Sequence, residues 1–121
     1  MGFREHTGVI AEANAPVARV STDDTAENAS GGVHGGLIAT LVDAAMGKAA
    51  RLTTDDDAKV VTVQLSITYL NGAKPGDELV ARAKVLKSSK NLALVTCEVH
   101  REGDDEHIAQ AQATFAISHK D

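Results

Sequence analysis

Large aromatic side chains are nearly absent: the 121-residue sequence contains two Phe, one Tyr and no Trp. The core must therefore consist mainly of Ala, Val, Leu and Ile, and so small a core leaves little room for a deep pocket within one chain. The length fits a single domain, and hydrophobic residues make up 43% of the sequence, which excludes a disordered chain. If the protein binds a large ligand, we expect a second copy of the chain to help form the site.

Cysteine is represented by a single residue, so no disulfide bond can form within the chain. Cys97 lies within a strand-like run, where a small buried apolar residue is a better interpretation than a nucleophile. Neither of the metal-binding spacings CxxC and HExxH occurs. We therefore expect no metal site.

Basic residues are in the minority, with 12 Lys and Arg against 17 Asp and Glu and a formal net charge of −5. This balance argues against a nucleic-acid-binding protein, which needs a basic surface. Charges stand at residues 1–8 where a signal peptide would be apolar, and charged residues also interrupt the apolar stretch 37–52. We expect neither a signal peptide nor a membrane span, and a cytoplasmic location.

The pattern of hydrophobic residues predicts one helix and five strands. Apolar side chains cover most of the circumference of a helix at 36–52, so we expect other structure around it. Residues 1–16 lack a strong periodicity and are interpreted as an N-terminal arm before a single domain at 17–121. Strands are predicted at 17–21, 59–70, 78–88, 92–102 and 107–118.

The last four predicted strands follow one another through short connections, which predicts an antiparallel meander. Strand 59–70 alternates strictly, which predicts that one face carries Val61, Val63, Leu65, Ile67 and Tyr69. Together these elements indicate an α+β fold, in which an antiparallel sheet curls around one central helix.

Chemically distinctive residues gather around the start of the predicted helix. His34, Gly35 and Gly36 stand where free backbone N–H groups and the helix dipole favour an anion or a developing oxyanion. Asp43 follows two turns later in an otherwise apolar helix, where a carboxylate needs a partner or a hydrated cavity. These residues are candidates for a catalytic site.

Each candidate also has a purely structural interpretation. The two glycines can provide a flexible helix start, and His34 can cap the helix or lie in the core. Asp43 can pair with a Lys or Arg of a neighbouring element, and Asn28 can be an ordinary loop residue. Only the combination of these residues favours a functional site.

The combination resembles the hotdog-fold acyl-CoA thioesterases, in the branch of the phenylacetate-pathway (PaaI-type) enzymes. The resemblance covers about residues 17–118 and depends on Asn28, on His34-Gly35-Gly36 six residues later and on Asp43 nine residues after His34. The strand at 62–69, the turn at 73–77 and the last strand at 108–115 also resemble this family. The resemblance implies a hotdog fold, with a long central helix wrapped by a curved antiparallel sheet.

The resemblance implies hydrolysis of the thioester of an acyl-CoA to a free acid and CoA, for an aryl, medium-chain or other acyl group. Asp43 would act as general base or as nucleophile, and the backbone N–H of Gly35 would bind the thioester carbonyl oxygen. Thr62 can also be a plain strand residue, and the turn at 87–90 can simply be solvated. The further roles implied are catalytic for Asn28, His34 and Thr62, and substrate-binding for Gly36, Lys87, Ser88 and Lys90.

The resemblance further implies a homo-oligomer, a dimer or a tetramer built as a dimer of dimers, with active sites between subunits. CoA is part of the substrate, so no separate cofactor is expected, and neither nucleic acid nor a membrane is an expected partner. Two other functions stay open: a hotdog module that binds acyl-CoA without turnover, and a hydratase or dehydratase. Asp43 favours the hydrolase, because a binding module needs no carboxylate beside the thioester.

Overall fold

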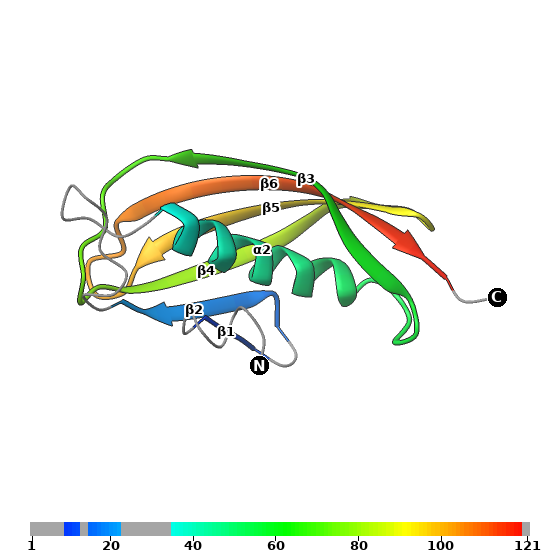
Figure 1. Ribbon diagram of the computed structural model, residues 1–121, viewed down its shortest axis with the longest axis horizontal. Coiled ribbons are helices and arrows are strands. Elements are labelled where there is room, and N and C mark those ends of the chain that lie inside the picture. The colour runs from blue at the N-terminus through cyan, green and yellow to red at the C-terminus, as the bar shows by residue number, and fades with distance from the viewer. Residues whose placement is uncertain (1–8, 13–14, 23–34, 120–121) are drawn as a thin grey trace.

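The computed structural model describes residues 9–12, 15–22 and 35–119. Within these ranges an antiparallel six-stranded sheet bends around one long helix, α2 (Gly35–Arg51), which lies on its concave side (Figure 1). The predicted α+β hotdog architecture is therefore confirmed. The strands in chain order are β1 (Ile10–Ala11), β2 (Val17–Ser21), β3 (Lys59–Tyr69), β4 (Glu78–Ser88), β5 (Leu92–Arg101) and β6 (His107–Ser118).

The bounds of the elements follow the hydrophobic pattern closely. The helix begins and ends one residue before its predicted limits, and β2, β4 and β6 have the predicted bounds. Strand β1 was not predicted, because two residues carry no alternation; it pairs with β2 through Ile10 and Arg19. Among the described residues, no helix is long and apolar enough to cross a membrane.

The predicted meander is wrong at one connection. Strands β4, β5 and β6 are consecutive neighbours, but β3 pairs with β6, so the spatial order is β1-β2-β4-β5-β6-β3. Residues 70–77, the crossing segment, pass the end of β6, where the N–H groups of Leu70 and Asn71 donate to the Ile108 carbonyl oxygen at 2.9 and 3.2 Å. Periodicity identifies a strand but not its neighbour, and this connection is long enough to reach the far edge.

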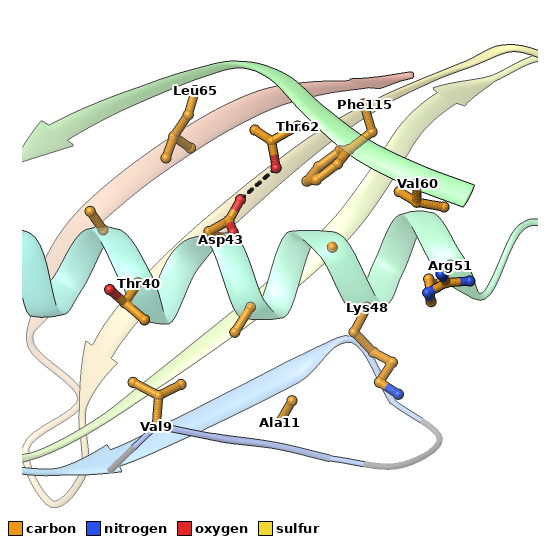
Figure 2. A pocket seen from close by; sticks show the side chains of 13 residues that line it. Val9, Ala11, Thr40, Asp43, Lys48, Arg51, Val60, Thr62, Leu65 and Phe115 are labelled. Carbon is orange, nitrogen blue, oxygen red and sulfur yellow. Dashed lines mark hydrogen bonds between the residues drawn. The ribbon is translucent and has the colours of Figure 1, made fainter. Parts of the chain in front are cut away.

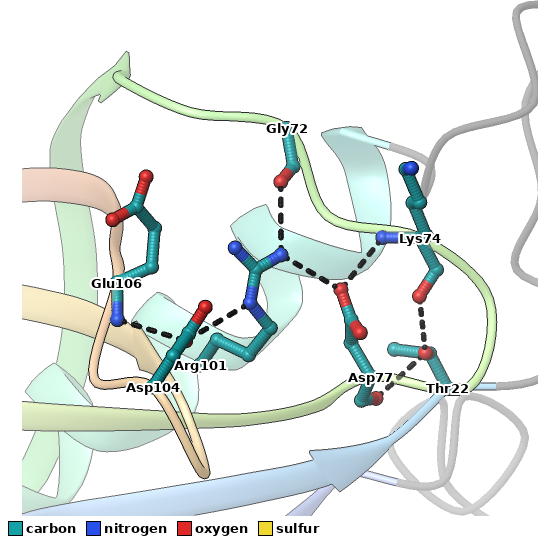
Figure 3. A network of polar contacts seen from close by, with 7 residues as sticks. All are labelled: Thr22, Gly72, Lys74, Asp77, Arg101, Asp104 and Glu106. Carbon is teal, nitrogen blue, oxygen red and sulfur yellow. Dashed lines mark hydrogen bonds and ion pairs between the residues drawn. The ribbon is translucent and has the colours of Figure 1, made fainter.

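Arg101 at the end of β5 holds the crossing segment. Its guanidinium donates to the Asp77 carboxylate at 3.1 Å and to the Gly72 carbonyl oxygen at 3.5 Å (Figure 3). The same guanidinium donates to the Asp104 carboxylate at 3.2 Å. From the end of β2, the Thr22 hydroxyl donates to the Asp77 carbonyl oxygen at 2.7 Å. These contacts tie the crossing segment to β2 and to the β5–β6 turn.

A β-bulge interrupts the alternation of β3. Thr62 lies opposite Phe115 of β6, and Gln64 lies opposite the preceding residue, Thr114. Val63 is therefore an extra residue in β3, which shifts the side-chain alternation by one position.

The bulge changes which residues of β3 face the helix. Val60 and Thr62 face the pocket beside α2 before the bulge, and Leu65 does so after it. The prediction that Val61 and Val63 share the face of Leu65 is wrong, because their exposed fractions are 46% and 62%. The alternation of apolar residues in the sequence does not reveal the extra residue.

Small side chains bring the helix close to the sheet. Phe115 is the one large ring in the described core, 2% exposed, and a Cβ atom at Gly47 would lie 3.9 Å from that ring. The core of small aliphatic residues expected from the composition is therefore confirmed. Fully buried alanines with an exposed fraction of 0% occur on both layers: Ala45 and Ala50 on the helix, and Ala18, Ala81, Ala93, Ala109 and Ala113 on the sheet.

Candidate active site

A pocket of about 1110 Å³ lies beside α2, where the sheet does not close around the helix. Both edge strands line it, with Ala11 from β1 and Val60, Thr62 and Leu65 from β3. Figure 2 shows the side chain of Asp43 pointing from the helix toward β3. The pocket is therefore on the open side of the curled sheet.

Asp43 supplies the carboxylate of this pocket. Its side chain is half-buried, and the Thr62 hydroxyl donates a hydrogen bond of 2.9 Å to Asp43 Oδ1 (Figure 2). The bulge at Val63 puts Thr62 on the helix side of the sheet, within reach of the carboxylate. A carboxylate keeps further lone pairs, so it can still accept a proton or a hydrogen bond from water. Two of the predicted catalytic residues are thus in direct contact.

The helix start is the second part of the candidate site. Gly35 is the first residue of α2, and its carbonyl oxygen accepts a hydrogen bond of 3.0 Å from the Tyr69 hydroxyl. A Cβ atom at Gly36 would meet nothing within 4 Å, so the backbone there is open to approach. The N–H groups of the first turn have no partner within the helix and carry the positive end of its dipole. The helix start is therefore suited to stabilise an oxyanion.

The remaining predicted site residues do not join this group. Lys87, Ser88 and Lys90 are exposed at the end of β4 and in the turn to β5. In Figure 1 this turn lies at the end of the molecule opposite to the start of α2. Asn28 and His34 lie outside the described residues.

Two basic residues of the pocket were not assigned from the sequence. Lys48 and Arg51 line its end near the C-terminus of α2, and Arg51 Nη1 also donates to the Ala58 carbonyl oxygen at 3.0 Å. A helical stripe through Asp43 and Gly47 reaches Arg51 one turn later, and Lys48 follows the pocket-lining Ala44 by one turn, so this spacing contains the missing signal. The pocket therefore joins a carboxylate to a basic end.

Cys97 takes no part in the site. It lies on β5 with an exposed fraction of 1%, and burial together with the nearby Glu98 carboxylate raises the pKa of its thiol to about 12. Thiolate is the reactive form of cysteine, so this thiol is inert at neutral pH. The prediction of a small buried residue is confirmed.

The fold and the pocket define a hotdog protein with a carboxylate beside its central helix. Residues 30–108 match the Thioesterase superfamily, and the chain belongs to this family. It is 37% identical to acyl-coenzyme A thioesterase 13 of Homo sapiens over 98 residues, which cover 81% of this chain and 69% of the human protein. The resemblance to acyl-CoA thioesterases is thus confirmed.

Solved structures agree with this assignment. A Bacillus halodurans protein solved with CoA has a TM-score of 0.84 and 25% identity, over 94% of this chain and 74% of that protein. The Escherichia coli PaaI protein has a TM-score of 0.83 and 19% identity, over 93% of this chain and 81% of that protein. At this identity the likeness to PaaI concerns the fold alone.

Proposed function

We propose that the protein hydrolyses the thioester bond of an acyl-CoA to a free acid and CoA. The observation that carries this proposal is the Asp43 carboxylate, held by the Thr62 hydroxyl at 2.9 Å in the pocket. The family supports it, as do the human acyl-coenzyme A thioesterase and the Bacillus halodurans protein solved with CoA.

The proposed reaction needs a base or nucleophile and an oxyanion donor. Water attacks the carbonyl carbon, the C–S bond breaks, and the proton released by water passes to the CoA thiolate. Asp43 carries that proton, or it attacks the carbonyl carbon itself and forms an anhydride that water hydrolyses. The N–H group of Gly35 stabilises the oxyanion in either route. By the family resemblance, Asn28 would orient the water or the thioester, and His34 would hold Asn28 in place.

The separation of these groups supports a site shared by two subunits. Gly35 and Asp43 are eight residues apart on α2, which corresponds to about 12 Å along the helix axis. A carbonyl bound at Gly35 is therefore distant from Asp43 of the same chain. Strand β3 is an edge strand, and its exposed Val63 leaves an apolar surface for a second subunit. The proposed assembly is a homodimer or a tetramer formed from two dimers.

The phosphates of CoA need cations at the mouth of such a site. Lys48 and Arg51 provide positive charge at one end of the pocket. Lys87, Ser88 and Lys90 form an exposed basic turn away from Gly35 of their own chain. This turn is suited to contact CoA across a subunit interface, where a Lys is an adequate partner for phosphate.

Replacement of Asp43 tests the proposed hydrolysis. We expect D43N and D43A to lose at least about 100-fold in acyl-CoA hydrolysis, because both remove the carboxylate that acts on the water or the carbonyl. Thiol release from short, medium-chain, long and aryl acyl-CoAs measures the reaction and its acyl preference. The matched control is D57N, at an exposed position outside the pocket. Full activity in a folded D43A protein would contradict the proposal.

Two further measurements separate the alternatives. Tight binding of acyl-CoA without thiol release by the wild type would favour a binding module, and loss of enoyl-CoA absorbance would favour a hydratase. A single turnover in ¹⁸O-labelled water tests the nucleophilic role of Asp43, because label in its carboxylate arises only when water attacks the Asp43 carbonyl of an anhydride. The cytoplasmic location stays a prediction, and cell fractionation tests it.

A further inference from the structure

A cluster of two histidines and a glutamate lies on the face of the sheet opposite to α2. Glu98 and His100 are on β5, and His107 is the first residue of β6. One candidate ligand atom from each residue lies within 4.8 Å of the others. The cluster is outside the pocket and takes no part in the proposed hydrolysis.

Strand geometry brings these three residues together. Glu98 and His100 are two positions apart and therefore share one face of β5. A register shift after Val99 places His107 directly opposite His100 across the β5–β6 pair. The two imidazole rings stack with centroids 4.7 Å apart and an angle of 23° between their planes.

One nitrogen of the cluster lacks a hydrogen-bond partner. His107 Nε2 is buried without one, and its distance of 3.8 Å to Glu98 Oε1 is too long for a hydrogen bond. His100 Nε2 lies 3.5 Å from the same carboxylate oxygen. Buried polar atoms are nearly always paired, and an unpaired one calls for a water or an ion.

We propose that Glu98, His100 and His107 bind a divalent transition-metal ion such as Zn²⁺. Zinc bonds of about 2.0–2.2 Å in tetrahedral geometry place neighbouring ligand atoms about 3.3–3.6 Å apart. The Nε2–Oε1 distances of 3.5 and 3.8 Å are near this spacing, and they are longer than the hydrogen bonds that would otherwise join these groups. The Glu98 side chain is 56% exposed and free to adjust to an ion.

The ligand types select the class of metal. Two imidazoles with one carboxylate suit zinc and its transition-metal neighbours, whereas Mg²⁺ and Ca²⁺ prefer oxygen ligands. Three protein ligands leave a fourth position for water. The bound ion would join β5 to β6 across the turn between them. It would also anchor His107, whose carbonyl oxygen accepts a hydrogen bond of 2.7 Å from the Asn71 amide of the crossing segment.

Metal binding by the untagged, chelator-treated chain tests this proposal. Titration calorimetry should show one Zn²⁺ per chain, and Zn²⁺ should raise the thermal unfolding temperature while Mg²⁺ should not. Co²⁺ bound in the same place should develop the visible absorption of a four-coordinate ion. Absence of Zn²⁺ binding by the wild type would overturn the proposal.

Single substitutions locate the site. H100A and H107A should each weaken Zn²⁺ binding by about tenfold or more, and E98Q should also weaken it. The matched control is H119A, because His119 lies outside the cluster and its ring contacts the Lys90 carbonyl oxygen at 2.7 Å. H107Q replaces H107A if alanine impairs folding, as judged by circular dichroism. Wild-type Zn²⁺ affinity in folded H100A and H107A or H107Q would place the ion elsewhere and overturn the proposal.

Discussion

Thr62 sets the orientation of Asp43, because its hydroxyl donates to Oδ1 at 2.9 Å. T62V keeps the branched shape of the side chain and removes the donor. We expect T62V to lower kcat about tenfold, the lower end for a hydrogen bond to a charged group, and T62S to retain most of the activity. Steady-state thiol release measures both variants. Equal kcat in T62V and the wild type would show that Thr62 is only a strand residue.

Gly35 is restricted by Tyr69. A Cβ atom at position 35 would lie 3.2 Å from the Tyr69 hydroxyl oxygen, closer than ordinary van der Waals contact. We expect G35A to lower the thermal unfolding temperature, and to lower it less in a Y69F background, where the crowded oxygen is absent. G36A is the matched comparison, because a Cβ there has open space and alanine favours a helix over glycine. An equal effect of G35A in both backgrounds would rule out this contact as the cause.

Because β3 contains a bulge, the effect of deleting one residue from this strand depends on which residue is deleted. Deletion of Val63 removes the extra residue and leaves Thr62 and Leu65 on the helix side. Deletion of Ser66 instead turns Leu65 away from the helix, and because Leu65 is only partly buried the cost is less than the about 1.5–3 kcal/mol of a fully buried side chain. The thermal unfolding temperature should fall more on deletion of Ser66 than on deletion of Val63. The Val63 deletion should lower activity more than stability, because it moves Thr62 relative to Asp43.

The ion pair between Arg101 and Asp104 makes the stability of the β5–β6 turn depend on pH. A hydrogen bond from the Glu106 N–H group, followed by one from the Arg101 guanidinium, holds the pKa of Asp104 below its ordinary value. A lowered folded-state pKa stabilises the fold above the ordinary pKa of about 4 and loses this effect as the pH falls through the folded value.

D104N should therefore be less stable than the wild type near pH 7, and the difference should fade toward about pH 2. Unfolding temperatures across this range measure the effect. D105N, at the neighbouring position, is the control. Asp105 has a φ of 58°, and asparagine tolerates this backbone conformation. A stability difference between D104N and the wild type that is independent of pH would contradict the role of the charge.

Oligomerisation is the main prediction for the molecule as a whole. If Gly35 of one subunit works with Asp43 of another, G35P, which removes the N–H donor, and D43N should each be inactive alone. A mixed oligomer of the two should recover part of the activity, because it contains one intact site. Light scattering gives the assembly state. A fully active monomer at micromolar concentration would contradict the shared site.

The elements of the fold were predictable from the sequence, but their pairing was not. Hydrophobic periods identify α2 and the bounds of β4 and β6, because burial follows the helix and strand repeats. The pairing of β3 with β6 depends on contacts of the crossing segment, such as that of Asn71 with Ile108, which leave no periodic signal. The bulge at Val63 is hidden as well, because apolar and polar residues alternate without interruption from Val61 to Leu65 in the sequence.

The candidate site was predictable where it depends on position along one helix. Asp43 and Gly35 follow from their places on α2, and the contact of Asp43 with Thr62 agrees with the resemblance. The approach of Tyr69 to Gly35 depends on how the end of β3 meets the helix start. The cluster at His107 requires a register shift between two strands, so no short motif in the sequence reveals it.

The contact of Tyr69 with Gly35 has a spectroscopic consequence. The sequence contains one Tyr and no Trp, so nearly all intrinsic fluorescence of the protein comes from a single phenol ring. Its hydroxyl lies 3.0 Å from the Gly35 carbonyl oxygen, at the first turn of α2. The unlabelled protein therefore carries a natural optical reporter at the helix start, and occupancy of the oxyanion position should change its emission.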